Sequence, residues 1–257
     1  MTPTRPPGIP RVGRRDRAYR SLVVVLSGAW VGFMLMIAGP AQAARPMTTD
    51  DARIVDDKAC QVESWVRNYR RGGNEFWALP GCNPTGNLEI TLGGASFRPQ
   101  DAPSQSVFQG QLKTLFKPLE PDGWGIGLAI GTVNTRPQGP TDTRNHPYFY
   151  VPASFAFSGE RLVVHANVGA TRGNEGSGDV RGTWGIGAEY VVVPRALVIA
   201  ETYGVRGEPV QMQVGLRLWA VPNRVQVDAT FGNQGGTDGV GRWFSIGVRL
   251  LSPPFLP

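Results

Sequence analysis

The sequence predicts an all-β fold, an antiparallel transmembrane β-barrel of about twelve strands. Apolar and polar residues alternate in segments of about ten residues, which recur to the end of the 257-residue chain. Tight turns alternate with mostly longer, Gly-rich connections, and a leader of the export type precedes the first segment. A strand of about nine to eleven residues, apolar on one face and polar on the other, crosses a bilayer when it belongs to a closed barrel.

The first 43 residues are predicted to be a signal peptide. A basic stretch with six arginines precedes an apolar run at 22–37, and A-Q-A at 41–43 is a suitable cleavage site. An uncleaved membrane anchor is the alternative, because 21–44 carries no charge and is long enough to span a bilayer. The segment holds six Arg and one Asp, so without it the net charge falls from +6 to about +1. The basic composition therefore indicates no nucleic-acid partner.

Residues 44–57 are polar and acidic, and are expected to form a periplasmic N-terminal tail. The barrel is then predicted to occupy residues 58–257. A possible hairpin at its start, 59–69 and 75–82, is closed by R-R-G-G-N. Its alternation is poor and Pro80 interrupts the second run, so the barrel has ten strands without this hairpin and twelve with it. Twelve is the preferred count.

Register gives the hairpin a separate test. If the turn is centred near Arg71, Cys60 faces Cys82 and Trp65 faces Trp77. Both cysteines follow the export signal, and a pair in an oxidising compartment most often forms a disulfide. A reduced, buried pair is the alternative.

The remaining strands follow a firmer alternation. The clearest pair is V-Q-M-Q-V-G-L-R-L-W at 210–219 and R-V-Q-V-D-A-T-F at 224–231, joined by A-V-P-N. The other segments begin near Leu88, Phe108, Trp124, Phe149, Leu162, Trp184, Ala196 and Phe244. A soluble periplasmic β-protein could show the same alternation. The export signal and the asymmetric connections favour the outer membrane of a Gram-negative cell.

The polar face of these strands is expected to line a lumen and a solute path. The residues assigned to it are Glu89, Gln109, Gln111, Lys113, His165, Glu189, Gln213, Arg217, Asp228 and Arg249. A barrel of this size is narrower than an open porin, so these charges could instead pair across the interior and close it. A closed structural or adhesion barrel is therefore an alternative function.

One group within this face allows a catalytic hypothesis. Around the S-G-E-R turn, Ser154 lies opposite His165, and Glu189 could orient the imidazole. A hydroxyl, an imidazole and a carboxylate are the minimum for serine nucleophilic catalysis, so a lipid or ester hydrolase is a second alternative. No hydrolase motif, metal cluster, phosphate loop or dinucleotide fingerprint surrounds these residues. The chain is expected to be a transporter rather than an enzyme, with no metal and no cofactor.

The stretch W-A-L-P-G-C-N-P-T-G-N-L-E-I-T-L-G-G-A, Trp77–Ala95, resembles small exported barrels grouped as transporters of the phenol-degradation-pathway type. The resemblance implies passive, porin-like passage or binding of a small hydrophobic or aromatic solute, and it supplies no catalytic residue. The expected partners are the outer-membrane lipid bilayer, the barrel-assembly machinery and a small-molecule solute, with no nucleic acid.

Overall fold

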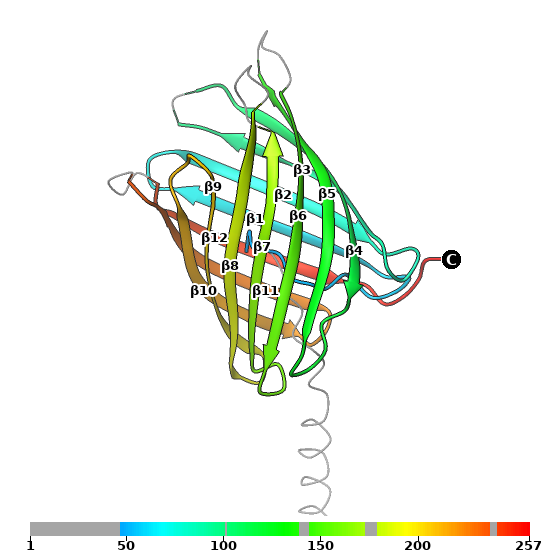
Figure 1. Cartoon of the computed structure of the whole chain (residues 1–257). Helices are drawn as coiled ribbons and strands as arrows, with labels where there is room; N and C mark the ends of the chain where they lie inside the picture. Colours follow the sequence, from blue (N-terminus) through cyan, green and yellow to red (C-terminus); the bar gives the residue numbers. More distant parts are fainter. Residues whose placement is uncertain (1–46, 101, 139–143, 173–178, 237–240) are drawn as a thin grey trace, which may run out of the picture. The chain divides into compact units, whose positions relative to one another are not determined.

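The computed structural model describes residues 47–257 except 101, 139–143, 173–178 and 237–240. Twelve antiparallel strands follow one another around a closed barrel, and β1 pairs with β12 to complete the circle (Figure 1). The strands are β1 (Cys60–Tyr69), β2 (Gly73–Cys82), β3 (Glu89–Arg98), β4 (Gln105–Lys117), β5 (Trp124–Pro137), β6 (Arg144–Phe157), β7 (Leu162–Arg172), β8 (Val180–Val193), β9 (Ala196–Val205), β10 (Gln211–Val221), β11 (Val225–Gln234) and β12 (Trp243–Leu251). Across the described ranges, no helix is both long and apolar enough to cross a membrane.

The predicted count of twelve strands is confirmed. The cysteine hairpin belongs to the wall, because β1 and β2 pair with each other along their whole length. The two ends of the barrel are named by the connections that they carry. The turn end, where β1 begins and β12 ends, has the connections 83–88, 118–123, 158–161, 194–195 and 222–224. The opposite end is the loop end.

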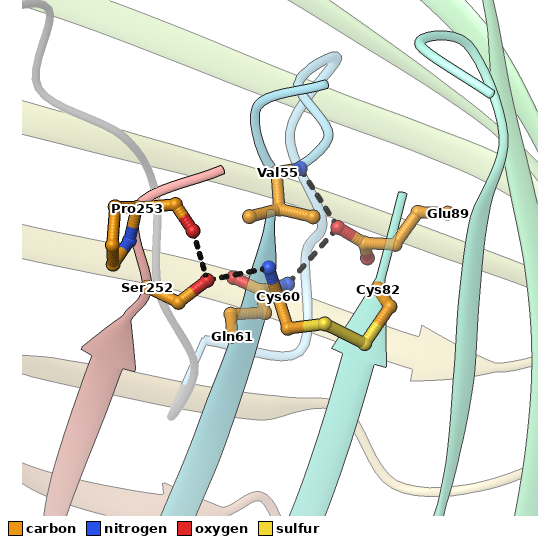
Figure 2. The surroundings of a disulfide bond; sticks show 7 residues. All are labelled: Val55, Cys60, Gln61, Cys82, Glu89, Ser252 and Pro253. Carbon is orange, nitrogen blue, oxygen red and sulfur yellow. Dashed lines mark hydrogen bonds between the residues drawn. A yellow bond between two sulfur atoms is a disulfide. The ribbon is translucent and has the colours of Figure 1, made fainter. Parts of the chain in front are cut away.

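The predicted register of the first hairpin is also confirmed. Cys60 pairs with Cys82 and the two form a disulfide at the turn end (Figure 2). Trp65 stacks on Trp77 with ring centroids 5.4 Å apart. The alternation of this hairpin is poor because its inward face carries indole rings where later strands carry amides and charges.

The disulfide joins neighbouring strands 22 residues apart in sequence. A cross-link of this length reduces the entropy of the unfolded chain and stabilises the fold by roughly 3 kcal/mol. We expect the Cys60→Ser/Cys82→Ser protein to keep its barrel but unfold at lower urea concentration, by about that free energy. Urea titration followed by tryptophan fluorescence measures the change; equal midpoints for the two proteins would contradict it.

The barrel is apolar outside and polar inside. Phe108, Leu216 and Ile246 are each more than half exposed on the outer face, at 54%, 55% and 53%. On the inner face Arg217, His165 and Gln226 are completely buried. A surface of this kind exceeds the apolar patches that soluble proteins tolerate, and it suits a hydrocarbon environment.

Candidate functional site: a lumen filled by the N-terminal segment

Residues 47–55 lie inside the barrel and lead to the exposed Asp56 and Asp57 at the turn end; we call the segment 47–57 the plug. Met47, Ala52 and Val55 are at most 3% exposed. The structure thus differs from the periplasmic tail predicted for this stretch. An acidic segment enters the interior because the wall offers it hydrogen-bond partners and a cation, features that the local sequence of the segment does not reveal.

Backbone amides of the plug are held by wall side chains. The segment forms no strand, so its buried N–H groups need acceptors from elsewhere. The amides of Thr48 and Thr49 donate to the Glu201 carboxylate at 2.7 and 2.6 Å. The amide of Asp50 donates to Asn167 Oδ1 at 2.5 Å. The amides of Ala52 and Val55 donate to Ser154 Oγ and Glu89 Oε2, each at 2.8 Å. Four strands, β3, β6, β7 and β9, therefore anchor the plug along its length.

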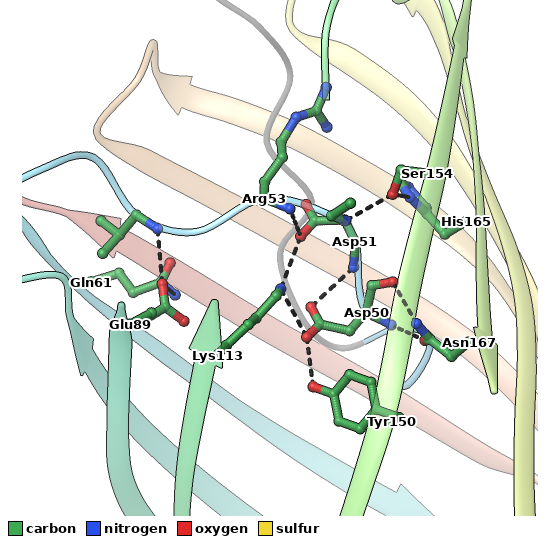
Figure 3. A network of polar contacts seen from close by, with 12 residues as sticks. Asp50, Asp51, Arg53, Gln61, Glu89, Lys113, Tyr150, Ser154, His165 and Asn167 are labelled. Atoms are coloured by element: carbon green, nitrogen blue, oxygen red, sulfur yellow. Dashed lines mark hydrogen bonds and ion pairs between the residues drawn. The ribbon is translucent and has the colours of Figure 1, made fainter. Parts of the chain in front are cut away.

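Lys113 on β4 is the charged clamp of the plug. Its Nζ lies 2.9 Å from Asp50 Oδ2 and 3.3 Å from Asp51 Oδ1 (Figure 3). The Tyr150 hydroxyl donates to the same Asp50 oxygen at 2.6 Å. The Lys113 side chain is 4% exposed, so removing it would leave two carboxylates poorly compensated inside the lumen.

A second buried ion cluster ties strands β8, β10 and β11 together. Arg217 Nε donates to Asp228 Oδ1 at 2.5 Å, and its Nη1 donates to Glu189. All three side chains are at most 1% exposed. Buried ions are stable only when paired in this way, so the cluster is a structural element of the lumen.

Aromatic side chains fill the lumen toward the loop end. Besides the stacked Trp65 and Trp77, Tyr69 contacts both Phe97 and Trp243, with centroids 6.3 and 6.2 Å apart. On the opposite wall, Tyr148 and Tyr150 are stacked at 6.1 Å and half-buried. The interior therefore has a polar, plugged part and an aromatic part.

A small cavity lies beside the plug. It has a volume of about 20 Å³ and lies among Asp50, Lys113, Glu89 and Arg249. That volume holds about one water molecule.

The ten residues predicted to line the lumen are all buried on the inner face. Their role as a solute path stays a prediction. The structure joins Glu89 and Lys113 to the plug, and it gathers Glu189, Arg217 and Asp228 into the ion cluster. Sequence reasoning missed the plug anchors Asn167 and Glu201. The signal for Glu201 was a lone carboxylate in an otherwise apolar strand.

The Ser154–His165 pairing is present, but its setting is that of an anchor. Ser154 Oγ lies 2.8 Å from His165 Nδ1 and accepts the amide hydrogen of Ala52. Both side chains are completely buried, and His165 Nε2 lies 3.8 Å from Glu189 Oε1, too far for a hydrogen bond. No substrate reaches the hydroxyl while the plug is in place. Within the described part of the chain, no group of three or more His, Cys, Asp or Glu side chains could hold a metal ion.

Comparison with known proteins identifies a family. Residues 32–251 match the family described as "Uncharacterised conserved protein UCP029691". The chain belongs to this family. Its description assigns no activity, so the resemblance to phenol-degradation-pathway transporters stays a prediction. No curated protein matches the chain in sequence.

Solved structures show the same fold. The KdgM porin superposes with a TM-score of 0.56 at 11% identity, over 74% of this chain and 98% of that one. The KdgM porin in complex with disordered oligogalacturonate also gives 0.56, at 10% identity, over 75% and 98%. At these identities the similarity concerns the fold alone, a closed barrel of the outer-membrane porin type.

Proposed function

We propose that the protein is an outer-membrane channel for a small solute, held closed by residues 47–57. The observation that carries the proposal is the plug itself. Beside its buried apolar side chains, the plug is held by hydrogen bonds to Glu201 and Ser154 and by an ion pair with Lys113. Hydrogen bonds and ion pairs of this type can be exchanged for contacts with water or a solute.

The solute class in this proposal is aromatic with a polar group. The resemblance of Trp77–Ala95 to aromatic-solute transporters suggests it. The stacked pairs Trp65/Trp77 and Tyr148/Tyr150 support it, because flat rings in a lumen favour contact with a flat solute. Gln109 and Gln111, which bond the Tyr148 hydroxyl, offer groups for a phenol or carboxylate.

The test is conductance and solute uptake by the purified protein in bilayers. We expect brief, rare openings for the native chain and frequent ones when the plug is loosened by Lys113→Gln. Liposomes carrying that variant should admit phenol and benzoate faster than a sugar of similar mass. Insertion of both proteins without conductance would favour a closed structural barrel, and failure to insert would contradict the membrane location itself.

A further inference from the structure

Arginines are frequent at the loop end of the barrel. Five stand at or just after the ends of alternate strands, and a sixth precedes β12, the neighbour of β1: Arg70 after β1, Arg98 on β3, Arg136 on β5, Arg172 on β7, Arg206 after β9 and Arg242 before β12. All six are exposed. The amides of Arg70 and Arg206 still bond to the neighbouring strand, to Arg242 O and Gly182 O, so the strand pairing extends to these positions.

Each of these arginines lies on the outer face. Side chains alternate along a strand, so residues an even number apart share a face. Arg98 shares its face with Leu92, Arg136 with Ile130, and Arg172 with Val168, which are 54%, 47% and 69% exposed. The basic groups therefore point toward the surroundings of the barrel and away from the lumen.

The turn end has no such excess. Its described charged residues balance, five basic and five acidic: Lys58, Lys117, Arg161, Arg195 and Arg224 against Asp56, Asp57, Glu120, Asp122 and Glu160. At the loop end, by contrast, arginines recur at the ends of alternate strands around the wall.

An apolar groove of about 730 Å³ crosses the wall beside Arg172, and Arg136 and Arg98 follow four and six residues beyond it along β5 and β3. Its floor has small residues, Gly110, Thr132 and Ala170, and its sides are the exposed Leu92, Leu112, Ile130, Phe149 and Val180. The strand register aligns Leu92, Gly110, Thr132 and Pro147 in one row across β3 to β6. Arg172 lines the groove.

We propose that this surface binds a phosphorylated, multiply acylated glycolipid of the lipid A class, with an acyl chain in the groove and phosphates on Arg98, Arg136 and Arg172. Guanidinium groups form bidentate, charge-assisted bonds with phosphate. The three arginines stand on alternate strands and are offset along them, because Arg172 continues the row of Leu92 and Thr132 while Arg136 and Arg98 lie four and six residues beyond it. Neighbours are therefore roughly 12 and 16 Å apart along the wall. One phosphate does not bridge that spacing, whereas a disaccharide phosphorylated at both ends spans it. This inference rests on the proposed outer-membrane location, with the loop end outward.

The experiment is native mass spectrometry of the detergent-solubilised full chain titrated with lipid A, with the same glycolipid lacking phosphate, and with phosphatidylglycerol. We expect lipid A to bind at least about tenfold more tightly than the other two, as two or more charge-assisted hydrogen bonds would give. The Arg98→Gln/Arg136→Gln/Arg172→Gln protein should lose that preference. The matched control is Arg161→Gln/Arg195→Gln/Arg224→Gln at the turn end, which should keep it.

A further variant tests the groove without altering charge. Gly110→Leu would fill the floor, and a Cβ at this position meets only Leu92 Cδ2, at 3.4 Å, so the wall should tolerate it. We expect it to weaken lipid A binding several-fold while the variant still folds.

Several results would overturn the proposal: equal affinity for the phosphate-free glycolipid, equal affinity for phosphatidylglycerol, or equal losses in the loop-end and turn-end variants. Conductance of Lys113→Gln in the same preparation separates this inference from the proposed function. A barrel that conducts but shows no lipid A preference refutes only the lipid site. A barrel that binds lipid A but never conducts refutes only the channel.

Discussion

Replacing Lys113 with glutamine is expected to open the lumen. The ammonium group is the cation that holds Asp50 and Asp51 inside the barrel, at 2.9 and 3.3 Å. Breaking one side of a buried ion pair costs about 3–5 kcal/mol, because the remaining carboxylates are left in a poorly solvating interior. The plug can avoid that cost by leaving the lumen. The ratio of open to closed barrels should therefore rise at least about a hundredfold.

Single-channel recording in planar bilayers measures this ratio directly. The matched control is Lys117→Gln, on the same strand, where the lysine pairs with Glu120 at 2.7 Å in an exposed position outside the plug contacts. The open fraction of this control should equal that of the native chain, since exposed ion pairs contribute little to stability. An unchanged open fraction in Lys113→Gln, with correct insertion, would mean that the plug does not gate the lumen.

The second large effect concerns the ion cluster of Arg217. Arg217→Gln leaves Glu189 and Asp228 buried side by side with their shared cation removed. We expect a loss of about 3–5 kcal/mol in the free energy of unfolding. Urea denaturation followed by tryptophan fluorescence measures it.

Two further proteins make the cluster result specific. Arg181→Gln removes an arginine whose pairing with Glu208 is half-exposed, and it should change stability by less than about 1 kcal/mol. The triple variant Arg217→Gln/Glu189→Gln/Asp228→Asn removes all three charges and should recover most of the lost stability. If the triple variant is as unstable as Arg217→Gln, loss of packing rather than unpaired charge explains the effect.

Residue alternation predicts most of this fold because one side chain in two must face lipid. Val210 to Leu218 and Ser154 opposite His165 could be placed by counting, since a strand has a period of two and a turn sets the register. The first hairpin was harder to predict because its inward face mixes Trp65 and Trp77 with charged and amide side chains, so the two faces differ little in polarity.

The plug could not be predicted in the same way. Residues 47–57 have no periodicity, and their partners lie 28 to 153 residues away in the sequence. Asp50 and Asp51 have the composition of a solvated tail. Only the closed barrel brings Lys113 from β4, Asn167 from β7 and Glu201 from β9 to one place. Contacts of this kind depend on the whole topology rather than on any local pattern.

The plug is joined to β1 through Lys58 and Ala59 alone. A ligand tethered by so short a linker acts at an effective concentration of millimolar or higher, whatever the amount of protein in the membrane. A displaced plug therefore remains next to its own binding site. We expect the channel to reclose by itself within each molecule, and a solute to hold it open only while its local concentration competes with that of the tethered segment.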